Sequence, residues 1–129
     1  MREIGVGMVG YSFMGRAHSN AYRQVPFFYP DIPIKPVLKA ICGRTKSAVD
    51  AAAANLGWAQ AVYDFDELLE RDDIDLIDIN TPNNTHVPMA IKAAQAGKHV
   101  ICEKPLGMTV AETEDALAAV REAGVVHML

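Results

Sequence analysis

Short apolar runs alternate with longer stretches of helical periodicity along the whole chain. Continuous apolar runs, rather than alternating ones, are typical of strands that are buried on both faces of a sheet. They predict strands at residues 4–9, 37–42, 61–63, 74–79, 99–102 and 125–129, and the stretches between them predict helices at 15–23, 46–56, 85–96 and from Thr109 to just before Gly124. This alternation predicts an α/β fold, a doubly wound parallel sheet with strand order 3-2-1-4-5-6.

Capping signals mark several of the expected helix ends. Thr109 with Glu112 has the spacing of a capping box, and Asp64 with Glu67, after the third predicted strand, has the spacing of a variant of it. Gly57 and Gly97 stand just past two of the apolar-periodic stretches. These residues support the predicted helix boundaries.

The predicted fold indicates where a ligand would bind. In a doubly wound sheet, the strand-to-helix loops meet at the carboxyl edge of the strands. We therefore expect residues 10–15, 43–46, 80–85 and 103–109 to converge. Residues 24–36, with four prolines around Phe27–Tyr29, are expected at the opposite edge as a packed loop or a subunit contact.

Composition excludes several classes of protein. The chain has 129 residues, of which half are hydrophobic and 22% charged, with a net charge of −4. This composition is typical of one globular domain and argues against a nucleic-acid partner. No apolar run approaches the ~20 residues of a membrane span, and no signal region opens the chain. Cys42 and Cys102 are expected to be free thiols three strands apart, with no metal between them, in a cytoplasmic protein.

Charge is distributed unevenly along the chain. Residues 1–46 hold seven basic and two acidic side chains, whereas residues 47–129 hold five basic and fourteen acidic ones. Two interpretations stay open: two solvated faces of different charge, or a first third that meets an anionic small molecule.

Glycines follow the first predicted strand and open the first predicted helix. Gly10 suits a tight turn and Gly15 a close helix–strand contact, as in a dinucleotide-binding loop whose amides hold a pyrophosphate. Ser12 stands where the usual fingerprint has glycine. The predicted cofactor contacts in this loop are Gly10, Tyr11, Ser12, Phe13 and Met14.

Two polar residues near these elements have no obvious partner in the sequence. His18 lies one turn into the first helix, where a packing role is favoured over a place at the edge of the site. Asp78 lies within the fourth predicted strand and should be a buried carboxylate.

The end of the second strand bears on the choice of cofactor. NAD-binding folds usually place an acidic residue here to bind the adenosine ribose. This chain has Gly43-Arg44-Thr45 instead, so Arg44 and Thr45 are predicted to bind a 2′-phosphate, with NADP preferred and NAD as the alternative. A surface arginine without a ligand is the competing interpretation.

Two later loops carry further candidates. Thr81, Pro82, Asn83 and His86 are predicted to shape the pocket around a cofactor ribose, and Asn84 or Thr85 could also cap the helix that follows. Glu103-Lys104-Pro105 places a lysine at the carboxyl end of the fifth strand, where it is a candidate for binding substrate or relaying a proton.

With these motifs the chain resembles the Gfo/Idh/MocA family, the relatives of glucose–fructose oxidoreductase and inositol dehydrogenase. The resemblance rests on Phe13–His18, on Thr81-Pro82 with His86, and above all on Ala96–Val100 with Glu103–Pro105. It implies a Rossmann-type cofactor domain in which Lys104 orients substrate and cofactor as the catalytic residue and Glu103 contacts the cofactor. It also implies a second α/β domain that carries most substrate contacts, so residues 1–129 are expected to be the cofactor domain of a longer enzyme, ending within its sixth strand.

The expected function is therefore that of an NAD(P)-dependent oxidoreductase acting on a sugar, cyclitol or related polyol, as a homo-oligomer. Three alternatives stay open. A non-catalytic dinucleotide sensor would not need the Glu103-Lys104 pair, and a methyltransferase-like fold would need an acidic residue after the second strand. A relative that cleaves glycosides with the help of NAD is the third.

Overall fold

The computed structural model describes residues 1–129 and contains one parallel six-stranded sheet. The strand order is β3-β2-β1-β4-β5-β6, which confirms the doubly wound prediction. The strands are β1 (Arg2–Val9), β2 (Ile34–Cys42), β3 (Gln60–Val62), β4 (Leu76–Ile79), β5 (His99–Cys102) and β6 (His127–Met128). The helices are α1 (Phe13–Phe28), α2 (Lys46–Leu56), α3 (Phe65–Leu69), the 3-10 turn η1 (Asn83–Thr85), α4 (His86–Gln95) and α5 (Val110–Ala123).

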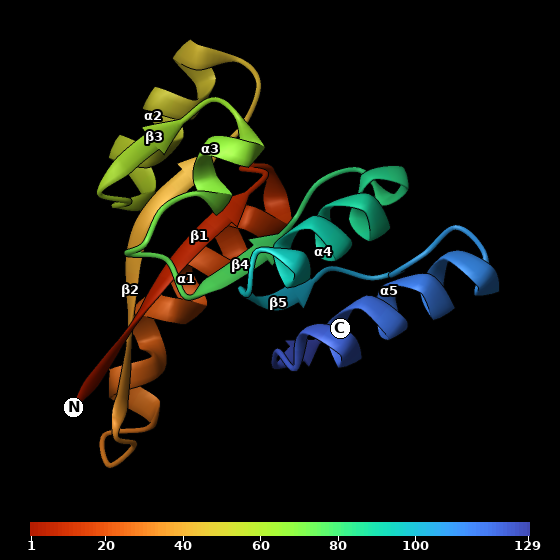
Figure 1. Ribbon diagram of the computed structural model, residues 1–129. Helices are drawn as coiled ribbons and strands as arrows, with labels where there is room; N and C mark the ends of the chain where they lie inside the picture. The colour runs from red at the N-terminus through yellow and green to blue at the C-terminus, as the bar shows by residue number, and fades with distance from the viewer.

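Helices cover both faces of the sheet (Figure 1). On one face, Val49 and Ala53 of α2 and Tyr22 of α1 pack against Val6 and Met8 of β1. On the other face, a core of twelve buried residues joins Leu68 of α3 and two alanines of α4 to β4 and β5. Helix α5 packs beside α4, at the blue end of the ribbon. The central strands are thus buried on both sides, as their continuous apolar runs predict.

Helix α1 is longer than predicted, and the proline-rich loop is correspondingly shorter. The helix runs to Phe28 and includes Pro26, so the connection to β2 covers only residues 29–33. Pro26 is tolerated because it lies in the last turn, where its missing N–H removes one hydrogen bond and no later turns depend on it. Strand β2 also begins earlier, at Ile34. Pro36 is tolerated there because β2 pairs with β3 only from Ala40 onward, which leaves its first half at an edge.

Two of the predicted capping residues, Asp64 and Thr109, are confirmed, whereas Thr85 stands at the N-cap of α4 without a side-chain capping hydrogen bond. Asp64 accepts hydrogen bonds from the N–H groups of Asp66 and Glu67 at the start of α3, and Thr109 accepts one from the N–H of Glu112 at the start of α5. Neither forms a full capping box: Glu67 makes no return contact to the N–H of Asp64, and Glu112 accepts from the N–H of Met108 rather than from that of Thr109.

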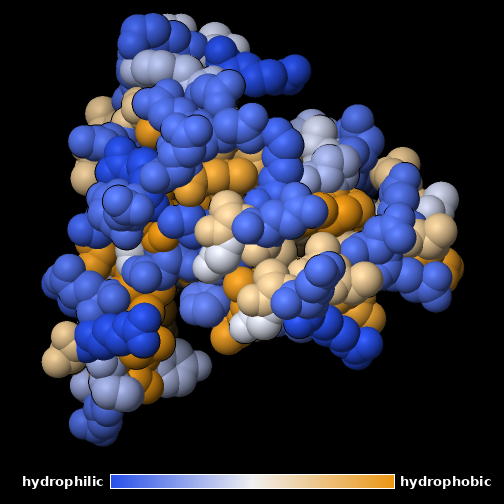
Figure 2. Space-filling model, viewed as in Figure 1, coloured by the Kyte–Doolittle hydropathy of each residue, from blue (hydrophilic) through white to orange (hydrophobic).

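The surface is mostly hydrophilic on the face drawn in Figure 2, with smaller hydrophobic areas near α3 and α4. Cys42 and Cys102 are buried free thiols on β2 and β5, with β1 and β4 between them. None of the helices combines the length and the apolar character that a bilayer crossing requires.

Candidate cofactor site

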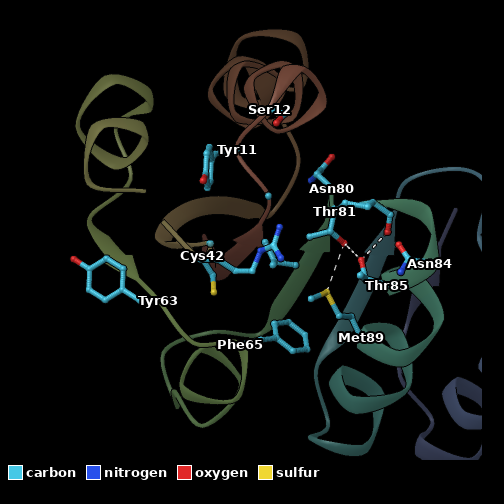
Figure 3. Close-up of a pocket in the computed structure, with 15 residues that line it drawn as sticks. Tyr11, Ser12, Cys42, Tyr63, Phe65, Asn80, Thr81, Asn84, Thr85 and Met89 are labelled. Atoms are coloured by element: carbon cyan, nitrogen blue, oxygen red, sulfur yellow. Dashed lines mark hydrogen bonds between the residues drawn. The ribbon is translucent and has the colours of Figure 1, made fainter. Parts of the chain in front are cut away.

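A pocket of about 430 Å³ opens at the carboxyl edge of the sheet (Figure 3). Its walls come from the loops that follow β1, β2, β3 and β4, together with α4. Tyr11 and Ser12 lie on one side of the opening, and Phe65 and Met89 lie on the other. This confirms that three of the four predicted loops converge, and the size suits a small-molecule ligand.

The loop after β1 is closely fitted to its neighbours. Gly10 has φ +95°, and a Cβ there would collide with the carbonyl oxygen of Asn80. A Cβ on Gly15 would likewise collide with the carbonyl oxygen of Gly10, so α1 begins directly against the turn. Ser12 is the N-cap residue of α1, yet its side chain makes no capping hydrogen bond. The amides and the positive end of the helix dipole are therefore available to an anion at this point.

The loop after β2 adds the only charged side chain that lines the pocket, Arg44. The ring of Tyr11 packs against Gly43, where a Cβ would collide with it. Tyr63 closes this end and accepts a hydrogen bond from Lys46 Nζ at 2.7 Å while it donates one to Asp50. The pocket lining contains no carboxylate, so a phosphate beside Arg44 would meet a cation and no like charge.

The loop after β4 forms the opposite wall. The hydroxyls of Thr81 and Thr85 lie 2.6 Å apart, and Thr85 also donates to the carbonyl oxygen of Pro82 at 2.7 Å. The amide group of Asn80 donates to Asp78 at 2.8 Å, whereas Oδ1 of Asn80 is buried without a hydrogen-bond partner. An unpaired acceptor in the lining of a pocket suits a donor from a ligand, such as a ribose hydroxyl.

His86 lies beneath the pocket rather than in its lining. It is 1% exposed. Its Nδ1 lies 2.7 Å from the carbonyl oxygen of Pro105, and its Nε2 lies 2.8 Å from the carbonyl oxygen of Thr81. The ring thus ties the loop after β4 to the loop after β5, and any effect on a cofactor passes through these two backbone segments.

The loop after β5 lies beside the pocket and meets a polar cluster. The N–H of Glu103 donates to Ile79, and a carboxylate oxygen of Glu103 lies 3.1 Å from Nε2 of His18. Nδ1 of His18 lies 2.9 Å from the fully buried carboxylate of Asp78, which also accepts from the hydroxyl of Tyr22 at 2.9 Å. Burial and the Asp78 charge raise the pKa of Tyr22, so this hydroxyl stays protonated and donates. The side chain of Lys104 is exposed and makes no hydrogen bond or ion pair.

The structure divides the predicted site residues into two groups. Six of them line the pocket: Gly10, Tyr11, Ser12, Arg44, Thr81 and Pro82. The others surround it without lining it: Phe13 and Met14 in the first turn of α1, Thr45 at the N-cap of α2, Asn83 in η1, His86 beneath the pocket, and Glu103 and Lys104 after β5.

Several lining residues were not predicted individually. Asn80 and Tyr63 each come directly after a strand, so their place at the carboxyl edge was a usable signal. Phe65 and Met89 lie on helices and carry no motif. The bridging position of His18 had no signal in the sequence, because it depends on three separate elements.

These features fit a nicotinamide dinucleotide. Free amides at the start of α1 suit the pyrophosphate, and the unpaired oxygen of Asn80 suits a ribose hydroxyl. Arg44 and Tyr63 line the same pocket, where a cation and an aromatic ring suit the adenosine half of the dinucleotide.

Comparisons with known proteins identify the family. Residues 4–129 match the family model described as "Oxidoreductase family, NAD-binding Rossmann fold". Levoglucosan dehydrogenase of Pseudarthrobacter phenanthrenivorans is 40% identical over 129 residues, which are 100% of this chain and 33% of that protein. A glycosyl hydrolase family 109 protein of a Shewanella species is 42% identical over 121 residues, which cover 87% of this chain and 25% of that protein.

Solved structures agree with this assignment. A levoglucosan dehydrogenase in complex with NADH and levoglucosan superposes with a TM-score of 0.95 and 40% identity, over 98% of this chain and 34% of that one. An oxidoreductase domain protein from Kribbella flavida gives a TM-score of 0.94 and 50% identity, over 99% of this chain and 35% of that one. This chain thus spans between a quarter and about a third of the length of these relatives. The chain belongs to the Gfo/Idh/MocA oxidoreductase family, and residues 4–129 correspond to its NAD-binding Rossmann fold.

Proposed function

We propose that this chain is the cofactor domain of an oxidoreductase that transfers hydride to or from a sugar or a related polyol, with the dinucleotide held in the pocket described above. The observation that carries the proposal is the close-packed turn of Gly10 and Gly15, which places the N-terminus of α1, without a side-chain cap, at a pocket whose lining contains no carboxylate. The sugar-oxidising relative supports the substrate class. Since the relatives are about three times as long, contacts that select the sugar are assigned to the rest of such an enzyme. The two buried free thiols support a cytoplasmic location as part of the same proposal.

When bound, the dinucleotide supplies the hydride acceptor or donor. The residues of this chain would bind and orient it: the amides of Ser12, Phe13 and Met14 at the start of α1 would hold the pyrophosphate, and Thr81 and Pro82 would form the wall beside it. Lys104 is the proposed catalytic residue, because its ammonium is unpaired and exposed at the carboxyl edge. It would orient the reacting oxygen of the substrate and move a proton to or from it.

The finer part of the proposal concerns the cofactor. Arg44 is the sole charged residue in the lining, and Thr45 follows it at the N-cap of α2 with a hydroxyl that makes no cap hydrogen bond. This arrangement favours a 2′-phosphate, and hence NADP(H) over NAD(H). A charge-assisted arginine–phosphate contact contributes about 1.5–3 kcal/mol, or about 10- to 150-fold in affinity.

Calorimetric titration of the 129-residue chain with NADH and with NADPH tests both the general function and the preference for NADP(H). Binding of either dinucleotide supports the general function, and tighter binding of NADPH supports the finer one. Arg44→Ala is expected to remove the preference for NADPH while it leaves NADH affinity within a few-fold. Lys35→Ala, an exposed cation on the distal half of β2, is the matched control and should change neither affinity. No binding of either dinucleotide contradicts the general function, and equal affinities contradict the NADP preference.

Lys104→Ala tests the catalytic assignment separately. In a sugar oxidoreductase that carries this chain, kcat is expected to fall by about 10²–10⁴-fold while the dissociation constant of the dinucleotide stays within a few-fold. A nearly unchanged kcat would make Lys104 a surface residue of the loop.

Glycoside cleavage with retained cofactor is a second candidate, favoured by the 42% identity to the glycosyl hydrolase family 109 protein. The two candidates differ in the fate of the cofactor. A dehydrogenase accumulates reduced dinucleotide in proportion to product. With an aryl glycoside as substrate, a glycoside-cleaving enzyme releases the aryl alcohol, and the absorbance of the reduced nicotinamide shows no net change.

A further inference from the structure

His18 lies between two carboxylates from different strands. Its Nδ1 is 2.9 and 3.1 Å from the two oxygens of Asp78 on β4, and its Nε2 is 3.1 Å from an oxygen of Glu103 after β5. Asp78 is fully buried, and the side chain of Glu103 is 17% exposed. The ring therefore spans from α1 to the loop that carries Lys104.

The two contacts of the ring require two N–H donors. A neutral imidazole carries one N–H and one lone pair, so it would turn the lone pair toward one of the two carboxylates. The doubly protonated ring donates to both and offsets one of their two charges. The other groups around it do not supply that charge, because Tyr22 and Asn80 are neutral donors to Asp78 and Cys102 is a buried thiol. Lys104, the cation next to Glu103 in the chain, makes no ion pair with Glu103 or Asp78.

Glu103 carries the contact onward to the catalytic candidate. One oxygen of its carboxylate faces His18, and the other accepts a hydrogen bond from the backbone N–H of Lys104 at 3.2 Å. On the far side of the same turn, His86 holds the carbonyl oxygen of Pro105. In the Glu103-Lys104-Pro105 turn, His18 thus holds the side chain of Glu103, and His86 holds the backbone at Pro105.

We infer that His18, as a doubly protonated ring, is a positioning residue that holds Glu103 and, through it, the backbone of Lys104. The hydrogen bonds to Asp78 raise the pKa of His18 against the opposing effect of burial, and the contact with Glu103 adds to the rise. Loss of the ring proton turns a lone pair toward one carboxylate and releases the Glu103 side chain. The catalytic meaning of this hold rests on the proposed role of Lys104, whereas the hold itself is a property of the folded chain.

Nuclear magnetic resonance of the 129-residue chain without cofactor tests the inference. The ring resonances of His18, assigned by their loss in His18→Gln, are expected to titrate at a higher pH in the folded chain than in the same chain unfolded in urea. Below that midpoint, the ring nitrogen shifts are expected to be those of an imidazolium. The backbone amide of Lys104 is expected to shift with the same midpoint, and this response should be absent in His18→Gln. A histidine that only packs against Asp78 would not move the Lys104 amide.

Two further variants keep the test decisive if His18→Gln does not fold. Asp78→Asn is expected to lower the His18 midpoint, and Glu103→Gln to lower it less and to abolish the Lys104 response. His127→Gln, on the exposed strand β6, is the matched control and should change neither. A His18 midpoint equal to that of the unfolded chain, or a Lys104 amide that does not follow it, would overturn the inference. Titration of the same sample with NADH is scored separately, so that a failure of dinucleotide binding rejects the proposed function and leaves the His18 result intact.

Discussion

Asp78 shows how a single buried charge is accommodated in this fold. Its carboxylate is fully buried and accepts hydrogen bonds from His18, Tyr22 and Asn80. A buried carboxylate with fewer partners would destabilise the fold, because each charge-assisted hydrogen bond contributes about 1.5–3 kcal/mol to the free energy of unfolding. Two of the donors lie on α1, so this residue also fixes the helix that begins at the glycine turn.

The His18–Asp78 contact predicts a pH-dependent stability. Because the pKa of His18 is raised in the folded chain above its ordinary value of 6.5, the protonated ring stabilises the fold fully below pH 6.5. That contribution is lost as the pH rises through the folded pKa. His18→Gln should therefore lower the melting temperature at pH 6 by about 3–5 °C, for a loss of about 1 kcal/mol, and by less at pH 9. Thermal denaturation at both values measures this, and an equal loss at both would contradict it.

The thiols of Cys42 and Cys102 are expected to react slowly in the folded chain. Burial raises the pKa of Cys42 and of Cys102 to about 12, with neighbouring carboxylates adding to the rise. Since the thiolate is the reactive form, both should be nearly inert to a disulfide reagent at pH 8 in the folded chain. Both should react within the mixing time in denaturant. Rapid reaction of either thiol without denaturant would show that its strand opens readily.

At the scale of elements, the start of α1 depends on two glycines for different reasons. Gly10 needs a positive φ, whereas Gly15 needs only the absence of a Cβ against the Gly10 carbonyl. This close contact places the start of α1 directly after the turn, with its N-cap residue Ser12 in the lining of the pocket.

Gly15→Ala should therefore affect both stability and NADH affinity, whereas an ordinary glycine substitution affects stability alone. It is expected to cost about 1–3 kcal/mol of stability through overpacking. It should also reduce NADH affinity by about tenfold, as expected if one charge-assisted bond to the pyrophosphate is lost. Gly97→Ala is the matched control. A Cβ there meets no atom within 4 Å, so the variant carries only the strain of its φ of +73°, about 1–2 kcal/mol, and should leave NADH affinity unchanged. If Gly15→Ala and Gly97→Ala changed NADH affinity equally, the start of α1 would have no specific role in cofactor binding.

The sequence predicted the type and order of the elements better than their limits. Helix caps at Asp64 and Thr109 are local hydrogen bonds between neighbours in the chain, so their signals could be read directly. Pro26 and Pro36 misled the prediction, because their tolerance depends on position in the last helical turn and on an unpaired half of β2. Such tolerance is a property of tertiary pairing.

For the whole molecule, the same distinction holds at the site. The topology of a doubly wound sheet predicted which loops meet, and Gly10, Arg44 and Thr81 do line one pocket. It did not predict that His86 turns beneath the pocket to bind Thr81 and Pro105, or that His18 joins Asp78 to Glu103. These contacts join residues that are up to 85 positions apart in the chain, and periodicity carries no information at that range.

The last expectation for the whole molecule is self-association of the 129-residue chain. Strand β6 pairs on one side with β5 and leaves its other edge free, and Val126, Met128 and Leu129 are more than half exposed around it. A hollow of about 130 Å³, lined mostly by apolar side chains, lies beside Met128 and Leu129. A free strand edge next to apolar surface is a site where a second copy can add.

Sedimentation velocity over a wide range of concentration measures this association. The weight-average mass of the unmodified chain should rise with concentration, and Met128→Glu combined with Leu129→Glu should hold it at the monomer mass, since two charges at the strand edge oppose pairing. Phe27→Ser is the matched control, because Phe27 is also apolar and exposed but lies at the end of α1. A mass that stays monomeric in the unmodified chain contradicts the expectation. A rise that Phe27→Ser abolishes instead would assign the contact to the aromatic residues before β2, where Phe27 and Phe28 stack edge to face with centroids 5.4 Å apart.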